Sequence, residues 1–199
     1  MTDRIAVVFG ARGGIGAAVR TEFLASGYRV IPINSSTVDF SKSKSYAQVH
    51  EILTHAAADV VVNCVGHFDK VNAETHHKTM DINIGSNWAI IQHYMKTPPA
   101  KPVKIIMLGS SVYNSPRRAY ILYAASKTAL YNVWQGACEY FENSPVTVGL
   151  INPVRTRTPL VGITTTAMCI EPEEVAQEIL SMASTNSNQL VDMKYPEET

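Results

Sequence analysis

Tyr123 and Lys127 lie four residues apart in the stretch YAASKTAL, residues 123–130. At that spacing, two side chains share one face of a helix. A free phenol has a pKa of about 10 and exchanges protons poorly at neutral pH, but a neighbouring ammonium group stabilises the phenolate and lowers that pKa. The pair therefore indicates either a tuned proton donor or a solvated tyrosine and lysine on a helix surface.

A glycine-rich turn near the start of the chain is a second candidate for chemistry. The stretch GARGGIG (10–16) follows the apolar run IAVVF (5–9) and precedes a helix-like segment. Gly10, Gly14 and Gly16 would allow a tight turn and bring backbone N–H groups against a pyrophosphate at a helix N-terminus. Such a turn can also serve chain geometry alone, but its place after the first predicted strand favours dinucleotide binding.

These residues need a scaffold, and the apolar runs indicate which one. The runs are continuous and rich in β-branched residues, as in strands that are buried on both faces. They alternate with helix-like segments, which predicts a Rossmann-type doubly wound parallel sheet with three layers, in a single domain over residues 1–199. The predicted strands are 5–9, 28–33, 59–66, 103–111, 146–153 and 189–193, and the predicted helices are 14–26, 43–56, 73–96, 123–142 and 172–184.

Composition narrows the classes of partner. Lys plus Arg equals Asp plus Glu at 17 each, so no net charge draws the chain toward nucleic acid or an anionic membrane. Cys64, Cys138 and Cys169 form no metal-ligand pattern and are expected to be free thiols. No apolar run is long enough to span a bilayer, and the N-terminus does not resemble a signal peptide. We expect a soluble, cytoplasmic protein without a metal.

Five motifs, taken together and in this order, resemble the short-chain dehydrogenase/reductase family. They are GARGGIG (10–16), NCVG (63–66), DIN (81–83), GSS (109–111) and YAASK (123–127). The chain departs from the family pattern in three ways: Phe9 precedes the glycine turn, NCVG replaces NNAG, and the chain is short. The resemblance implies an enzyme that interconverts a ketone and a secondary alcohol by hydride transfer. The short length suggests an abbreviated substrate-covering loop late in the chain.

The resemblance also implies a catalytic set of Asn83, Ser110, Tyr123 and Lys127. Tyr123 would be the acid/base, and Lys127 would also bind the nicotinamide ribose. The family spacing of thirteen residues before the tyrosine selects Ser110 to hold the substrate oxygen, with Ser111 a structural neighbour unless the register slips by one. Asn83 would bend the central helix and hold a water in a proton relay, or only bend the helix.

The end of the second predicted strand bears on the choice of cofactor. PINSS (32–36) lacks the acidic residue that would bond a ribose 2′-hydroxyl, which favours NADP(H) over NAD(H). Arg12 is either a partner for the 2′-phosphate or a solvated arginine. These arguments and the resemblance together place the cofactor against Gly10, Arg12, Gly14, Ile15, Gly16, Ser35, Asp39, Phe40, Asn63, Val65, Gly66, Tyr123, Lys127, Pro153 and Thr158.

Three arginines would lie near the reacting centre: Arg117, Arg155 and Arg157. They suggest an anionic substrate such as a phosphate ester, although salt bridges or cofactor phosphates would equally use them. The stretches SSVYNSPRRAYILY and INPVRTRTPL resemble the ribulose 5-phosphate reductase domain of CDP-ribitol synthesis, whose cytidylyltransferase would here be a separate partner.

The alternatives are a reductase of a less polar ketone or oxoacyl group, and a catalytically silent dinucleotide sensor. By resemblance, the long helices at 73–96 and 123–142 would pair copies of the chain into a homodimer or homotetramer.

Overall fold

The computed structural model describes residues 4–42, 44–68, 76–115, 118–161 and 168–196, and these form a parallel six-stranded sheet between two layers of helices. The sheet order is β2-β1-β3-β4-β5-β6. The strands are β1 (Ile5–Phe9), β2 (Arg29–Ile33), β3 (Val60–Asn63), β4 (Val103–Leu108), β5 (Val146–Asn152) and β6 (Gln189–Asp192). The predicted Rossmann-type fold class is confirmed.

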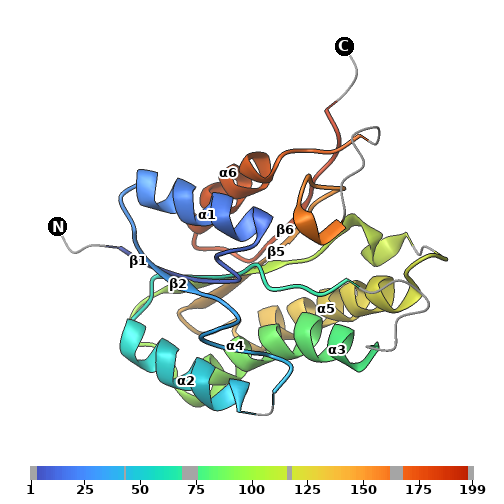
Figure 1. Ribbon diagram of the computed structural model, residues 1–199. Coiled ribbons are helices and arrows are strands. Elements are labelled where there is room, and N and C mark those ends of the chain that lie inside the picture. Colours follow the sequence, from blue (N-terminus) through green and yellow to red (C-terminus); the bar gives the residue numbers. More distant parts are fainter. Residues whose placement is uncertain (1–3, 43, 69–75, 116–117, 162–167, 197–199) are drawn as a thin grey trace.

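Helices cover both faces of this sheet (Figure 1). One face carries α1 (Gly14–Ala25) and α6 (Pro172–Ala183), and the opposite face carries α2 (Ser45–Ala56), α4 (Ser86–Lys96) and α5 (Ile121–Tyr140). The shorter elements are α3 (His76–Met80), the π-helical turn η1 (Asp81–Gly85), and the 3₁₀ turns η2 (Ser111–Asn114) and η3 (Pro159–Val161).

Burial on both faces explains the continuous apolar runs. Within β1, Val7 and Phe9 enter the core beneath α2, α4 and α5, whereas Ala6 and Val8 enter the core beneath α1 and α6. Neighbouring side chains of a strand point to opposite faces of the sheet. When both faces are buried, every position of the strand favours an apolar residue.

Strand order reverses between β1 and β3, because the chain first moves from β1 to β2 and then returns past β1. In open α/β sheets, ligands bind outside the carboxyl ends of the strands at such a reversal. The dinucleotide-binding order 3-2-1-4-5-6 has a further strand beyond the second one. Here the described residues between β2 and α2 form no strand, and β2 is the edge strand on that side of the sheet.

The predicted helix over 73–96 is divided in the structure. Residues 76–96 run through α3, η1 and α4, and residues 73–75 lie outside the described part. The side-chain amide of Asn87 donates a hydrogen bond of 2.8 Å to the carbonyl oxygen of Asn83 within the wider turn. A side-chain donor that satisfies a backbone acceptor stabilises such an interruption.

Lys104 is a buried, ionisable side chain near the amino-terminal end of β4, away from the carboxyl ends of the strands. Its Nζ donates to the carbonyl oxygen of Ser187 at 2.6 Å and to Oε1 of Gln189 at 3.1 Å, which joins β4 to the start of β6. Burial lowers the pKa of this lysine from 10.5 to about 8. Between those two pH values, the unfolded chain holds the proton more tightly than the folded one.

We expect the lowered pKa of Lys104 to make the free energy of unfolding depend on pH. Since the unfolded state binds more protons between the two pKa values of Lys104, about 8 and 10.5, the contribution of this lysine to the free energy of unfolding rises with pH over that interval. Urea unfolding of wild type and Lys104→Met should show wild type gaining about 1–3 kcal/mol on the variant across the interval. A difference that stays constant with pH would contradict the lowered pKa.

Candidate active site

Two cavities follow the carboxyl ends of the strands and meet beside β3. The first has a volume of about 280 Å³ and lies over the ends of β1, β2 and β3. The second has a volume of about 250 Å³ and lies over the ends of β3, β4 and β5. Both are lined by Cys64, Val65 and Gly66, so they form one continuous groove across the strand reversal.

The glycine turn forms part of the wall of the first cavity. Gly10 has a φ of +75°, and a Cβ atom there would lie 2.9 Å from the backbone carbon of Cys64. A methyl group on Gly16 would overlap the carbonyl oxygen of Gly10, and one on Gly14 would lie 2.6 Å from Cγ2 of Thr158. The turn therefore needs glycine for space as well as for conformation.

Helix α1 starts from this turn with free donors. Its N-cap, Gly13, offers no side-chain hydrogen bond, and its first turn holds no acidic residue. The first backbone N–H groups of a helix that lack side-chain caps favour an anion. The glycine turn and these N–H groups form a cradle that fits the pyrophosphate of a dinucleotide.

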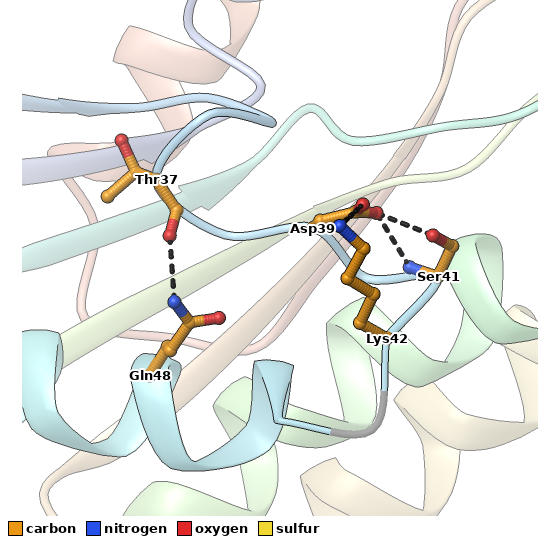
Figure 2. Close-up of polar contacts among 5 residues, drawn as sticks. All are labelled: Thr37, Asp39, Ser41, Lys42 and Gln48. Carbon is orange, nitrogen blue, oxygen red and sulfur yellow. Dashed lines mark hydrogen bonds and ion pairs between the residues drawn. The ribbon is translucent and has the colours of Figure 1, made fainter.

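The loop after β2 lines part of the first cavity and is held by internal hydrogen bonds. Figure 2 shows these contacts. Oδ1 of Asp39 accepts from the backbone N–H of Ser41 at 3.1 Å and from its hydroxyl at 2.7 Å, and Oδ2 pairs with Lys42 at 3.3 Å. The bonds from Ser41, and then Lys42, hold the pKa of Asp39 below its usual value. Gln48 of α2 donates to the carbonyl oxygen of Thr37 at 3.1 Å, which anchors the loop to that helix. Asp39 thus presents a fixed, ionised carboxylate to the cavity.

Ser110, Tyr123 and Lys127 meet in the second cavity. Lys127 is buried; its Nζ donates to the carbonyl oxygen of Leu108 at 2.8 Å and lies 5.6 Å from the centre of the Tyr123 ring. Burial lowers the pKa of Lys127 to about 8. The two residues share one face of α5, as the spacing predicted.

The pKa of Tyr123 differs from the expectation. Burial raises it, a hydrogen bond with Ser110 lowers it, and Tyr120 raises it further. The loss of hydration around the phenol therefore outweighs any help that the Lys127 ammonium gives to the phenolate. In this protein Tyr123 is held in its protonated form at neutral pH.

Asn83 lies behind the cavity and braces it. Its Oδ1 accepts from the backbone N–H of His67 at 2.7 Å, and its Nδ2 donates to the carbonyl oxygen of His67 at 3.0 Å and to Oγ of Ser126 at 2.9 Å. Ser126 in turn donates to the carbonyl oxygen of Tyr123 at 2.7 Å. Asn83 thus fixes the loop after β3 against the start of α5 from within the π-helical turn; its role in a water relay stays a prediction.

The remaining predicted cofactor residues divide between walls and supports. Walls of the two cavities are formed by Gly10, Arg12, Ile15, Ser35, Asp39, Phe40, Val65, Gly66, Pro153 and Thr158. Asn63 is a support: its Nδ2 donates to Oγ of Ser86 at 2.9 Å and its Oδ1 accepts from the N–H of Val65 at 3.2 Å, which shapes the turn that the cavities share.

The predicted substrate arginines have different surroundings. Arg155 is exposed and lines the second cavity. Arg157 forms an ion pair of 2.6 Å with Glu171 and is not among the described residues that line either cavity. Arg117 lies outside the described residues. The geometry therefore brings Arg155, of the two described arginines, to Ser110 and Tyr123.

Comparison with known proteins matches this geometry to a family. The family model for short chain dehydrogenases matches residues 35–168. The chain belongs to the short-chain dehydrogenase family. The matched segment begins after the glycine turn and includes Asn83, Ser110, Tyr123 and Lys127.

A sequence relative of this family member is the bifunctional ribulose 5-phosphate reductase/CDP-ribitol pyrophosphorylase Bcs1 of Haemophilus influenzae. It is 26% identical over 220 residues, which cover 100% of this chain and 44% of that protein. The chain thus spans less than half the length of that relative.

Solved structures share the fold. A short chain dehydrogenase from Burkholderia cenocepacia in complex with NADP has a TM-score of 0.83 and 18% identity, over 96% of this chain and 88% of that one. A 3-ketoacyl-(acyl-carrier-protein) reductase from Brucella melitensis complexed with NADH has a TM-score of 0.81 and 17% identity, over 96% of each chain.

Several wall residues of the second cavity in this short-chain dehydrogenase were not predicted. Phe68 and Tyr120 pack around Tyr123, with ring centres of Phe68 and Tyr123 4.9 Å apart, and Leu160 and Tyr195 complete the wall. Phe68 follows the NCVG motif by two residues, which could have indicated it. No spacing in the sequence points to Tyr195, which arrives from the segment after β6.

Within the described residues, no helix is long and apolar enough to cross a membrane. Across the same residues, no cluster of three or more His, Cys, Asp or Glu side chains could hold a metal ion.

Two helical glycines offer a matched test of the cradle. A methyl group at Gly16 would overlap the carbonyl oxygen of Gly10, whereas at Gly136 in α5 it would meet nothing within 4 Å. We expect Gly16→Ala to cost about 1–3 kcal/mol of unfolding free energy through overpacking and to weaken binding of a nicotinamide dinucleotide. Gly136→Ala should gain about 0.5–1 kcal/mol from helix propensity and bind the dinucleotide as wild type does. Urea unfolding measures the first effect, and titration with NADH and NADPH measures the second. Equal behaviour of the two variants would refute the cradle.

Proposed function

We propose that this chain is an NADP(H)-dependent reductase that interconverts a small phosphorylated ketose and its secondary alcohol, with ribulose 5-phosphate as the first substrate to test. The observation that carries the proposal is the convergence of Ser110, Tyr123, Lys127 and Arg155 in one cavity. The similarity to the Haemophilus influenzae protein, whose name includes a ribulose 5-phosphate reductase, supports the choice of substrate.

A dinucleotide would lie along the groove that the two cavities form. The adenosine end would occupy the first cavity beside Asp39, the pyrophosphate would lie on the glycine turn, and the nicotinamide would enter the second cavity near Tyr123. Arg12 and Ser35 line the first cavity, and the residue that follows β2 is Asn34, not an acid. This combination supports a ribose 2′-phosphate and hence NADP(H).

Once bound, the nicotinamide supplies the hydride for the carbonyl carbon. The Ser110 hydroxyl would donate a hydrogen bond to the carbonyl oxygen and stabilise its developing charge. Tyr123, kept protonated by its raised pKa, would give its proton to that oxygen. The Lys127 ammonium beside the ring would stabilise the phenolate that remains. A protonated tyrosine in the free protein suits the reductive direction.

Arg155 is the described arginine that supports an anionic substrate. Its side chain is exposed at the cavity wall, and no acid among the described residues pairs with it, in contrast to Arg157. A guanidinium binds a phosphate through two parallel hydrogen bonds.

A second candidate function is the reduction of a less polar ketone or oxoacyl group. It is favoured by the apolar and aromatic part of the same cavity, where Phe68, Val112, Tyr120 and Leu160 lie. A hydroxylated sugar chain would gain little binding free energy from this apolar wall, whereas an alkyl chain would bury apolar surface against it.

The deciding experiment measures NADPH and NADH oxidation with ribulose 5-phosphate, xylulose 5-phosphate and a simple neutral ketone. Faster turnover of ribulose 5-phosphate with NADPH would support the proposal. Turnover of the neutral ketone alone would favour the second candidate. NADPH binding without turnover of any ketone would reject catalysis and favour a dinucleotide sensor.

The arginines provide a matched pair of variants. We expect Arg155→Ala to raise the KM for ribulose 5-phosphate about 10- to 100-fold, the effect of one lost charge-assisted hydrogen bond pair, with the Kd for NADPH unchanged. Arg157→Ala, which breaks the ion pair with Glu171, should change the KM less than about threefold. Equal loss of NADPH affinity in Arg155→Ala would instead place that arginine on the cofactor.

The rate of reduction should also fall in mildly alkaline solution. The pKa of Lys127 is lowered to about 8, so the ammonium is lost as pH rises through that value, while Tyr123 stays protonated because its own pKa is raised. The kcat/KM for NADPH, which reports the free protein, should drop about tenfold between one unit below and one unit above the pKa of Lys127. A flat profile over this interval would show that the charge of Lys127 is not required.

A further inference from the structure

We propose that Asn152 and Asp192 are positioning residues that set the orientation of Ser110 relative to Tyr123. The catalytic consequence rests on the proposed function, since it requires Ser110 to act on a carbonyl oxygen. The structural basis is a chain of hydrogen bonds that joins the ends of β4, β5 and β6 to helix α5.

The Asn152 side chain is the centre of this chain. It is buried at the end of β5, with 1% of its surface exposed. Its Oδ1 accepts from the backbone N–H of Ser110 at 3.0 Å, and its Nδ2 donates to Oδ1 of Asp192 at 2.9 Å. An N–H can only donate and an ionised carboxylate can only accept, so the amide has one orientation that satisfies both partners.

Gly109 makes the first of these bonds possible. A side chain on Gly109 would overlap Oδ1 of Asn152, so glycine leaves the space that the amide oxygen occupies. On either side of Ser110, the backbone N–H groups of Gly109 and Ser111 donate to the carbonyl oxygens of Ile151 and Pro153 at 2.7 and 3.0 Å. Three consecutive N–H groups around the serine are therefore held by β5 and the residue that follows it.

Asp192 carries the connection on to helix α5. Its Oδ2 accepts from the hydroxyl of Tyr113, in the turn η2 that follows Ser110, at 3.1 Å. The Tyr113 ring stacks on Tyr131 of α5 with ring centres 5.1 Å apart, and its carbonyl oxygen accepts from Thr128 of α5 at 2.6 Å.

Helix α5 also carries Tyr123 and Lys127, so Asp192 ties the strand that ends at the serine to the helix that bears the acid. A misplacement of about 1 Å between such groups costs on the order of 100-fold in rate. The network is therefore placed to hold the distance from the serine hydroxyl to the phenol.

An exchange of the two side chains separates positioning from simple support. Asn152→Asp alone would place two carboxylates at a distance that is now bridged by a hydrogen bond of 2.9 Å. The double variant N152D/D192N restores one acid and one amide. The carboxylate at position 152 could then accept from the Ser110 N–H and from the amide at position 192. That amide oxygen in turn accepts from Tyr113, so all three hydrogen bonds are retained.

We expect Asn152→Asp to lower kcat about 10- to 100-fold with the Kd for NADPH within about threefold of wild type. The double variant should recover kcat to within about fivefold of wild type. A kcat that stays near wild type in Asn152→Asp, that falls only in step with NADPH affinity, or that is not recovered in the double variant would overturn the proposal.

Asn188 provides the matched control. Its Oδ1 also accepts a backbone N–H of β5, from Val148 at 2.7 Å, but at the end of the strand remote from the cavities. Asn188→Ala should lower the melting temperature and leave kcat unchanged. Equal losses of kcat in Asn188→Ala and in an Asn152→Ala variant of the same melting temperature would show that Asn152 only supports the fold.

A measurement without substrate separates this proposal from the proposed function. Amide hydrogen exchange by NMR should show faster exchange at Ser110 in Asn152→Ala, with Val148 unchanged, because the N–H of Ser110 loses its acceptor. Unchanged exchange at Ser110 would overturn the positioning role. Absence of turnover in wild type, with faster exchange at Ser110 in the variant, would reject the reductase and keep the structural network.

Discussion

The buried ammonium group of Lys127, bonded to the carbonyl oxygen of Leu108, is the interaction on which the arrangement of the second cavity depends. A charge without water needs a fixed partner, and the last carbonyl of β4 supplies it. The bond ties α5 to the strand end that precedes Ser110, so the same contact fixes the cation and brings the helix that carries Tyr123 to the end of β4. Burial of the same region raises the pKa of Tyr123 and lowers the pKa of Lys127. The protonation of the acid and that of its electrostatic partner are therefore set by the same loss of hydration.

The two parts of the groove present different chemical groups: mainly backbone N–H groups at the glycine turn and mainly side chains around Ser110. Around the glycine turn, the donors are main-chain N–H groups at the start of α1, and space is made by the absence of side chains. Around Ser110, the groups are side chains held at the ends of strands and by α5. This division follows from the parallel sheet, whose interior is apolar on both faces and whose polar groups can gather only where the strands end.

The strands and most helices could be predicted from the sequence. A strand that is buried on both faces appears as a continuous apolar run, and a helix appears as apolar residues that recur every three to four positions. The glycine turn and the Tyr123–Lys127 pair could be found because local spacing encodes them. The family resemblance indicated that Asn83 bends the central helix, but the hydrophobic pattern did not. The bond from Asn87 to the carbonyl oxygen of Asn83 leaves no trace in a period of hydrophobic residues.

The direction of the Tyr123 pKa shift was also beyond the sequence. It depends on how much water Phe68 and Tyr120 exclude from the phenol, and Phe68 is 55 residues away in the chain. The bonds of Asn152 to Ser110 and Asp192 join residues 42 and 40 positions apart, which no motif connects. Long-range pairing, and with it the support of the site, became visible only in the fold.

The last strand has a consequence for how the protein is made. Tyr195, after β6, lines the second cavity, and Asp192 of β6 holds Asn152 behind Ser110. The glycine turn, Ser110, Tyr123 and Lys127 all come from earlier in the chain. As the polypeptide leaves the ribosome, the dinucleotide cradle can therefore form well before the pocket around the serine is complete. A newly made chain would pass through a stage at which the nucleotide has a binding surface and the carbonyl group has none, and synthesis of the final strand ends that stage.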